Sequence, residues 1–150
     1  MDIPLLLKEL DPTELTSESP VLMVLGIGTI SDMEEVAKFM YRGGPLIVGG
    51  PLVPNNNDYR PDPSYWYFVK KEMQILLCTN DKRYRKLWGQ INSLRKKSTT
   101  IIVGLIATFL GESIGAPATL LSGFIALCFY AAIKVGKEAF CNYIAQENKT

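Results

Sequence analysis

Residues 98–133 contain a single charged side chain, that of Glu112, and this stretch constrains the fold more than any other part of the 150-residue chain. Two uncharged arms, residues 98–111 and 113–133, flank it. The run Gly-Glu-Ser-Ile-Gly-Ala-Pro at 111–117 is typical of a turn, because it joins small residues to a proline that can begin a helix. Two helical arms of about 18 residues each span about 27 Å, close to the roughly 30 Å hydrocarbon core of a bilayer. The pattern predicts two antiparallel apolar helices joined by a turn around residues 112–115.

Basic side chains on both sides of this hairpin favour a membrane orientation. Lys134 and Lys137 follow it, and a basic segment precedes it. By the positive-inside rule, both ends of the hairpin are expected in the cytoplasm, with Glu112 at the far tip in water. The preceding segment is expected to lie against the anionic inner leaflet and to set the orientation. Its basic residues are Lys82, Arg83, Arg85, Lys86, Arg95, Lys96 and Lys97.

Small side chains in the hairpin are expected to let helices pack closely and to support a homo-oligomer, since lipid supplies no hydrophobic force between helices. In this apolar, small-residue composition, residues 98–133 resemble the insertion hairpin of colicin-type pore-forming domains. The resemblance covers this stretch alone, and it implies a hairpin that enters a membrane. The expected packing positions are Gly104, Thr108, Gly111, Gly115, Ser122, Gly123 and Ala126.

Two other structures fit the same apolar stretch. A soluble α-helical domain can bury such a hairpin at its centre, and an obligate interface with another protein can cover it. Fractionation separates these alternatives from a membrane hairpin. A membrane hairpin stays with membranes after carbonate or high-salt extraction, whereas a soluble protein stays in the supernatant.

The remaining segments favour an all-α fold. An acidic helical domain is expected at residues 1–81, which carry a net charge of −6, and a basic amphipathic helix at 82–97. The hairpin at 98–133 and a short cytoplasmic tail at 134–150 follow, and residues 82–150 together carry +7. Short strands are an open alternative around 46–53 and 65–78. Because the basic residues adjoin an apolar stretch rather than aromatic platforms, a nucleic-acid partner is not expected.

Three local patterns predict helices in the first two segments. Ser31 and Glu34 have capping-box spacing, which predicts a helix that starts there and ends before the Gly-Gly-Pro at 43–45. Apolar residues at helical spacing favour a helix over 64–78, with Lys70 on its polar side. Another apolar stripe predicts that 82–97 is helical and packs on the acidic domain. The stripe consists of Tyr84, Leu87, Trp88, Ile91 and Leu94.

The glycine-rich run at residues 43–54 is interpreted as structure rather than as a binding site. It nearly repeats, as GGPLIV followed by GGPLVP. A phosphate-binding loop requires a GK[ST] ending or a GxGxxG between a strand and a helix, and neither pattern is present. An irregular buried loop with two tight turns is therefore expected.

The chain contains no histidine, which removes the usual acid–base, nucleophilic and metal-binding chemistry of that side chain. Its three cysteines, Cys78, Cys128 and Cys141, are odd in number and widely spaced. A disulfide framework is therefore not expected, and a reducing cytoplasm fits better. No signal peptide is expected, because the apolar run after Met1 is short and lacks a basic region.

No enzyme activity, cofactor or metal is expected. The polar residues considered for catalysis have no partner at a meaningful spacing. These residues are Asp58, Asp62, Cys78 and Tyr84.

Together these patterns favour a small protein of the inner or plasma membrane that forms oligomers through its apolar hairpin. It is expected to perturb or permeabilise the membrane as a toxin or defence-type effector, under the control of residues 1–81, which can bind a protein partner. The alternative is a soluble, cytoplasmic all-α adaptor or inhibitor that binds a partner protein and keeps the hairpin in its core or interface.

Overall fold

The structure, a computed structural model, describes residues 3–19, 26–42, 62–94 and 98–149. These residues form eight α-helices and one 3-10 helix, with no strand among them, which confirms the all-α prediction. The segment 65–78, for which a strand was the alternative, is helical, and the possible strand at 46–53 lies outside the described residues. The helices are α1 (Ile3–Glu9), α2 (Pro12–Glu18), α4 (Ile30–Arg42), α5 (Pro63–Cys78), α6 (Arg85–Asn92), α7 (Thr99–Ile114), α8 (Ala118–Val135) and α9 (Lys137–Lys149), with η2 (Lys82–Tyr84) before α6.

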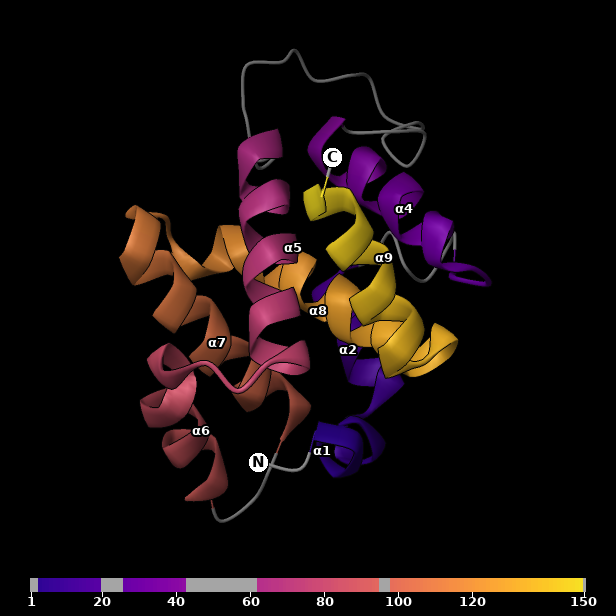
Figure 1. Cartoon of the computed structure of the whole chain (residues 1–150). Coiled ribbons are helices and arrows are strands. Elements are labelled where there is room, and N and C mark those ends of the chain that lie inside the picture. The colour runs from indigo at the N-terminus through magenta and orange to yellow at the C-terminus, as the bar shows by residue number, and fades with distance from the viewer. Residues whose placement is uncertain (1–2, 20–25, 43–61, 95–97, 150) are drawn as a thin grey trace.

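Helix α8 lies at the centre of the molecule (Figure 1). It contacts α1, α2, α4, α5, α7 and α9. All six consecutive residues from Phe124 to Phe129 are fully buried, so this part of the helix has no face toward water. A charge at any of these positions would be buried without solvent, which explains the absence of charged residues here.

The predicted hairpin of two apolar helices is confirmed as α7 and α8. Helix α7 continues through Glu112, so the turn lies slightly later than expected, at residues 115–117. Gly115 ends α7 in the left-handed conformation, with φ of 69°, which favours glycine. The amide of Ala116 then donates to the carbonyl of Gly111 at 3.0 Å. A Cβ at position 111 would collide with the Ala116 carbonyl oxygen, so this turn requires glycine there as well.

The helix predicted before the Gly-Gly-Pro at 43–45 is confirmed as α4. It begins at Ile30, however, so the capping box predicted at Ser31 and Glu34 was wrong. Asp32 rather than Glu34 closes the start of the helix, because its carboxylate accepts from the amides of Gly28 and Thr29 at 2.8 and 2.9 Å. These two hydrogen bonds lower the pKa of Asp32. Asp32 thus caps the helix by itself, and the Glu34 side chain is left to contact other helices.

Residues 82–97 were predicted to form one helix, but the structure has two shorter elements there, η2 and the two-turn helix α6. Residues 95–97 lie outside the described part. The stripe faces inward as expected, with Tyr84, Leu87 and Ile91 buried. Helix α6 packs mainly on α7 rather than on the acidic segment, and the Tyr84 ring lies 5.4 Å from that of Phe109 between ring centroids.

The expectation of a C-terminal tail at 134–150 was wrong, because residues 137–149 form helix α9. Phe140 and Ile144, four residues apart, are buried on one face of α9. This helix contacts α4, α5 and α8. A single hydrophobic core therefore includes side chains from Leu6 to Ile144, across all four segments expected from the sequence.

The expectation that no disulfide forms was also wrong. Cys78, at the end of α5, is bonded to Cys141 in α9, with a Cα–Cα distance of 5.9 Å. Cys128 is a free, buried thiol in α8. The sequence did not reveal this pairing because 63 residues separate the two cysteines and the antiparallel arrangement of α5 and α9 brings them together (Figure 1).

Candidate functional site

One face of α7 is exposed although the helix has no charged residue before Glu112. We define this α7 outer face by its exposed residues Thr100, Ile101, Gly104 and Thr108. Ile101 is 47% exposed, and nothing lies within 4 Å of a Cβ placed on Gly104. A surface helix of a soluble domain ordinarily presents charged residues on its outer side. Before Glu112, this helix is uncharged on both its buried and its exposed sides.

Helix α8 is the one described helix with the length and apolar composition to cross a membrane. Half of its residues are buried inside the bundle, and core helices of soluble proteins meet the same criteria. Helix α7, with 16 residues, is shorter.

The small residues predicted to pack the hairpin are spread over three environments. Gly111 and Gly115 lie at the α7–α8 turn, and a Cβ at position 111 would also lie 3.7 Å from Leu121 of α8. Gly104 and Thr108 are exposed on the α7 outer face, so they do not pack on α8 in this structure.

The other three small residues lie on α8, where Ala126 is buried and Ser122 is half-buried. A Cβ on Gly123 would come within 2.9 Å of the Met40 side chain and 3.3 Å of the Glu18 carbonyl. The helices that pack closely on α8 at Gly123 are therefore α2 and α4, and not its hairpin partner α7.

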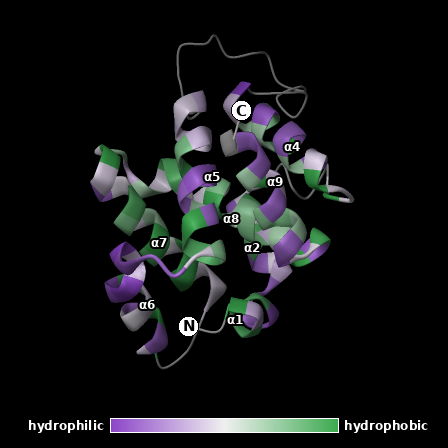
Figure 2. Cartoon of the chain, in the orientation of Figure 1, coloured by the Kyte–Doolittle hydropathy of each residue, from purple (hydrophilic) through white to green (hydrophobic). Residues whose placement is uncertain are grey.

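The basic residues predicted to face the membrane lie beside α7. Lys82, Arg85 and Lys86 are exposed on η2 and α6, and α6 contacts α7. Figure 2 shows this change from the hydrophilic ribbon of α6 to the hydrophobic ribbon of α7. The remaining predicted residues, Arg95, Lys96 and Lys97, lie outside the described part.

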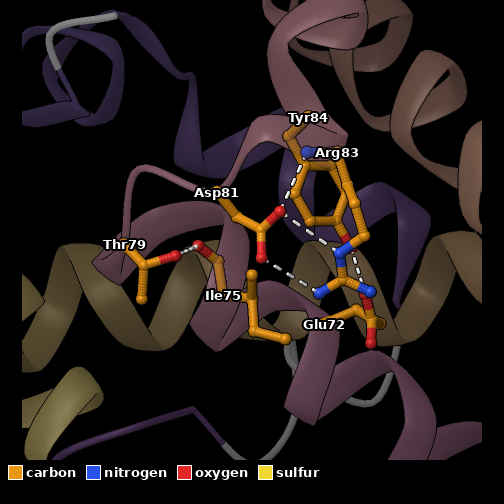
Figure 3. A network of polar contacts seen from close by, with 6 residues as sticks. All are labelled: Glu72, Ile75, Thr79, Asp81, Arg83 and Tyr84. Atoms are coloured by element: carbon orange, nitrogen blue, oxygen red, sulfur yellow. Dashed lines mark hydrogen bonds and ion pairs between the residues drawn. The ribbon is translucent and has the colours of Figure 1, made fainter.

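Arg83 has a structural contact that the sequence did not predict (Figure 3). Its guanidinium pairs with Asp81 at 3.3 Å and with Glu72 at 3.7 Å. Asp81 also caps η2 by accepting from the Arg83 amide at 2.8 Å. The buried Tyr84 hydroxyl donates to Glu72. Burial, together with this carboxylate, raises the pKa of Tyr84.

A second polar cluster joins three helices over α8. The Lys70 ammonium, with its side chain 6% exposed, lies 2.7 Å from carboxylate oxygens of both Glu34 and Glu147. Glu34 also accepts from the Trp66 indole at 3.0 Å and from the Tyr143 hydroxyl at 2.9 Å. We call these five residues the Lys70 cluster. They come from α4, α5 and α9.

The charges of the Lys70 cluster stabilise one another. Burial alone raises the pKa of Glu34, but hydrogen bonds from Lys70, Trp66 and Tyr143 outweigh it, so the pKa is lowered. Burial likewise lowers the pKa of Lys70, but hydrogen bonds to Glu147 and Glu34 outweigh it, so the pKa is raised. Both shifts favour the ion pair.

The sequence analysis placed Lys70 on the polar side of its helix, where it does not lie. The sequence contained a signal for the burial of Lys70, because this residue follows Trp66 by four positions and precedes Met73 by three. Both of those residues are fully buried. Lys70 also lines an open cavity of about 590 Å³ between α4, α5 and α9. The lining residues are Glu34, Tyr67, Lys70, Lys71, Tyr143, Ile144 and Glu147.

The residues considered for catalysis have structural partners. Asp62 caps α5 by accepting from the Ser64 amide at 2.8 Å, Cys78 is disulfide-bonded, and Tyr84 bonds to Glu72. Asp58 lies outside the described residues. Within the described ranges, no three Cys, Asp or Glu side chains come together as metal ligands do.

Comparison of the chain with protein-family models, curated proteins and solved structures gave no match. Functional interpretation therefore rests on the α7 outer face, the enclosed α8 and the contacts that hold the surrounding helices in place.

Proposed function

We propose that this protein associates with membranes, stores its α7–α8 hairpin inside a helical bundle and inserts the hairpin into an anionic bilayer. Once inserted, the hairpin forms oligomers and perturbs the membrane, as a toxin or defence-type effector does. The observation that carries this proposal is the α7 outer face, which is exposed and uncharged.

The α7 outer face gives the bundle a first point of contact with lipid. An uncharged helix side enters the interface at little desolvation cost, whereas charged side chains would have to be dehydrated. The exposed Lys82, Arg85 and Lys86 lie on the neighbouring α6 and its preceding turn, where they can attract anionic headgroups. An uncharged face beside a basic one is the arrangement that suits a negatively charged bilayer.

Insertion then requires α8 to leave its place among the other helices. Its 18 residues span about 27 Å, which matches the hydrocarbon core. The 16 residues of α7 span about 24 Å, so local thinning of the bilayer or snorkelling lysines must accommodate this helix. In the bundle, core side chains surround α8. After insertion, lipid and neighbouring copies take their place.

The test compares two lysine substitutions on α7, Thr108→Lys and Ser113→Lys. Both positions are exposed, so each variant should keep its free energy of unfolding within about 0.5 kcal/mol of wild type. A lysine at 108 would lie near the middle of the inserted helix, where a charge costs about 2.5–3.5 kcal/mol. A lysine at 113 would lie at the tip, near water.

With the Cys78–Cys141 disulfide reduced, we expect Thr108→Lys to lose carbonate-resistant flotation with anionic vesicles, and Ser113→Lys and wild type to keep it. Neutral vesicles should bind all three proteins less, because the basic residues of α6 then have no anionic lipid to attract them. Equal flotation of the two lysine variants, or no flotation of wild type with its disulfide reduced, would contradict insertion.

The second candidate function is a soluble all-α adaptor or inhibitor, favoured by the complete burial of residues 124–129. In that case the α7 outer face binds a partner protein, and α8 never leaves the core. The wild-type protein would then remain in the supernatant with both vesicle types, whether its disulfide is intact or reduced.

A further inference from the structure

We infer that the Cys78–Cys141 disulfide is a lock that keeps the apolar hairpin inside the bundle, and that its reduction by a cellular thiol releases α8. This inference rests on the proposed function for the step that follows release, the insertion of the hairpin into a bilayer. The lock itself can be tested without a membrane.

The disulfide joins two helices that cover the same side of α8. Helices α5 and α9 run antiparallel, contact each other and both contact α8 (Figure 1). The Trp66 ring of α5 lies 5.5 Å from the Phe124 ring of α8, between ring centroids. From α9, Phe140 and Ile144 are fully buried in the shared core. Helix α8 cannot leave on this side until α5 and α9 separate.

Two clamps oppose that separation, one toward each end of the α5–α9 pair. The disulfide is at the end formed by Cys78, the last residue of α5. Further along the pair, Lys70 of α5 bonds to Glu147 of α9 at 2.7 Å. The ion pair can break and reform as the molecule fluctuates, but the covalent clamp cannot. The disulfide therefore decides whether the pair can open.

The clamp is chemically reversible. A dithiol reductant attacks one sulfur as its thiolate and forms a mixed disulfide, and its second thiol then displaces the protein sulfur. The S–S bond between Cys78 and Cys141 breaks, both cysteines become thiols, and the reductant leaves as a disulfide. Two electrons and two protons pass to the protein. Both cysteines are half-buried rather than enclosed in the core, so they are partly accessible to this reaction. The lock is thus closed in an oxidising compartment and opens in a reducing one.

Cys128 in α8 provides a reporter of opening. It is fully buried, and it is the free cysteine when the disulfide is intact. In the variant Cys78→Ser/Cys141→Ser it is again the one thiol, so a maleimide labels the same site in both proteins. We expect Cys128 to react at least about tenfold faster in this variant than in oxidised wild type, because opening of the α5–α9 pair exposes it. Equal labelling rates would overturn the lock.

A control separates release from general destabilisation. Leu87→Ala removes a fully buried side chain from α6, which lies on the other side of α5 from α9 (Figure 1). Its free energy of unfolding is compared with that of the serine variant in urea. The oxidised Leu87→Ala protein should label Cys128 more slowly than the serine variant at equal unfolding free energy. Labelling as fast as in the serine variant would mean that the disulfide only stabilises the fold, and would overturn the inference.

If circular dichroism shows that the serine variant has lost its helices, reduced wild type replaces it. Mass spectrometry then compares alkylation of Cys128 in the reduced protein, which has three thiols, with its alkylation in reoxidised wild type, where it is the one free thiol. Alkylation of Cys128 as slow in the reduced protein as in the reoxidised one would again overturn the lock.

Flotation with anionic vesicles then tests the lock and the proposed function separately. Flotation of the unlocked protein but not of the oxidised one supports both the lock and the proposed function. Fast Cys128 labelling without flotation of either form supports the lock and contradicts the proposed function.

Discussion

The side chain of Lys70 shows how one buried charge can organise several helices. It is held between Glu34 of α4 and Glu147 of α9, and Glu34 has further donors in Trp66 and Tyr143. A buried charge that loses its partners is costly, so each contact depends on the others. The residue types alone did not reveal the cluster, because its members lie up to 113 positions apart in the chain.

Replacement of Glu34 should therefore reduce stability much more than replacement of its neighbour. We expect Glu34→Gln to lower the free energy of unfolding by about 1–3 kcal/mol, because it removes a charge-assisted bond to Lys70. Glu35→Gln is the matched control. Glu35 is 61% exposed and lies 3.8 Å from Lys38, so its loss should cost at most about 0.5 kcal/mol. Urea unfolding measures both, and equal losses would contradict the role given to the cluster.

The effect of Glu34→Gln should also depend on pH. The pKa of Glu34 is lowered in the folded protein from its ordinary value of 4.5, so its contribution is present above 4.5 and is lost as pH falls through the folded pKa. The stability difference between wild type and Glu34→Gln should be largest near neutral pH and should shrink below about pH 4. A difference that stays constant, or grows, in acid would show that Glu34 is not ionised in the cluster.

Two glycines of α7 should respond in opposite directions to alanine. At Gly111 a Cβ meets the backbone carbonyl of Ala116, so Gly111→Ala should destabilise the fold by about 1–3 kcal/mol. At Gly104 nothing lies within 4 Å, so Gly104→Ala should stabilise the helix by about 0.5–1 kcal/mol. Thermal unfolding distinguishes the signs. Destabilisation at position 104 would mean that this position is not open as described.

Among whole elements, those with a strong periodic signal were predicted best. The α7–α8 hairpin was predicted from its uncharged arms and its turn residues, and α5 from apolar residues at helical spacing. The start of α4 was misplaced because Ser31 and Glu34 have capping-box spacing, while Asp32 caps the helix in the structure. Helix α9 was missed as a core element, although Phe140 and Ile144 already marked a buried face four residues apart.

Helix α9 should accordingly contribute to the stability of the whole fold. Phe140 is fully buried, and we expect Phe140→Ala to cost about 3–5 kcal/mol. Asn142→Ala, at an exposed position of the same helix, should change stability by no more than about 0.5 kcal/mol. A loss of less than about 1 kcal/mol for Phe140→Ala in urea unfolding would indicate that residues 134–150 are a tail after all.

At the scale of the whole molecule, the sequence suggested separate segments, whereas the structure has one core. The acidic and basic halves of the chain are not separate bodies, because α1, α2, α4 and α5 all contact α8. Sequence reasoning could not predict this arrangement, since it depends on which apolar faces meet and not on their periodicity. The disulfide adds a long-range constraint. Because a link across 63 residues lowers the conformational entropy of the unfolded chain, it stabilises the fold by about 4 kcal/mol.

The same arrangement relates the two structures that the apolar stretch allowed. A hairpin buried in a soluble bundle and a hairpin in a bilayer are, in our proposal, two states of one protein. The bundle shields α8, and we propose that the hairpin first meets lipid at the α7 outer face. The central claim is that the middle of α7 moves from water into the hydrocarbon core.

The depth of residue 108 in a vesicle tests that claim most directly. Thr108→Cys and Ser113→Cys each place a thiol at an exposed position of α7. A polarity-sensitive fluorophore can be attached there in the disulfide-bonded protein, before it is unlocked, while Cys128 is still buried. On unlocked protein bound to anionic vesicles, we expect the probe at 108 to shift to the blue and to be quenched most by spin labels deep in the acyl chains. The probe at 113 should be quenched most by labels near the headgroups. A probe at 108 that keeps its aqueous emission and responds to a water-soluble quencher would contradict insertion of the hairpin.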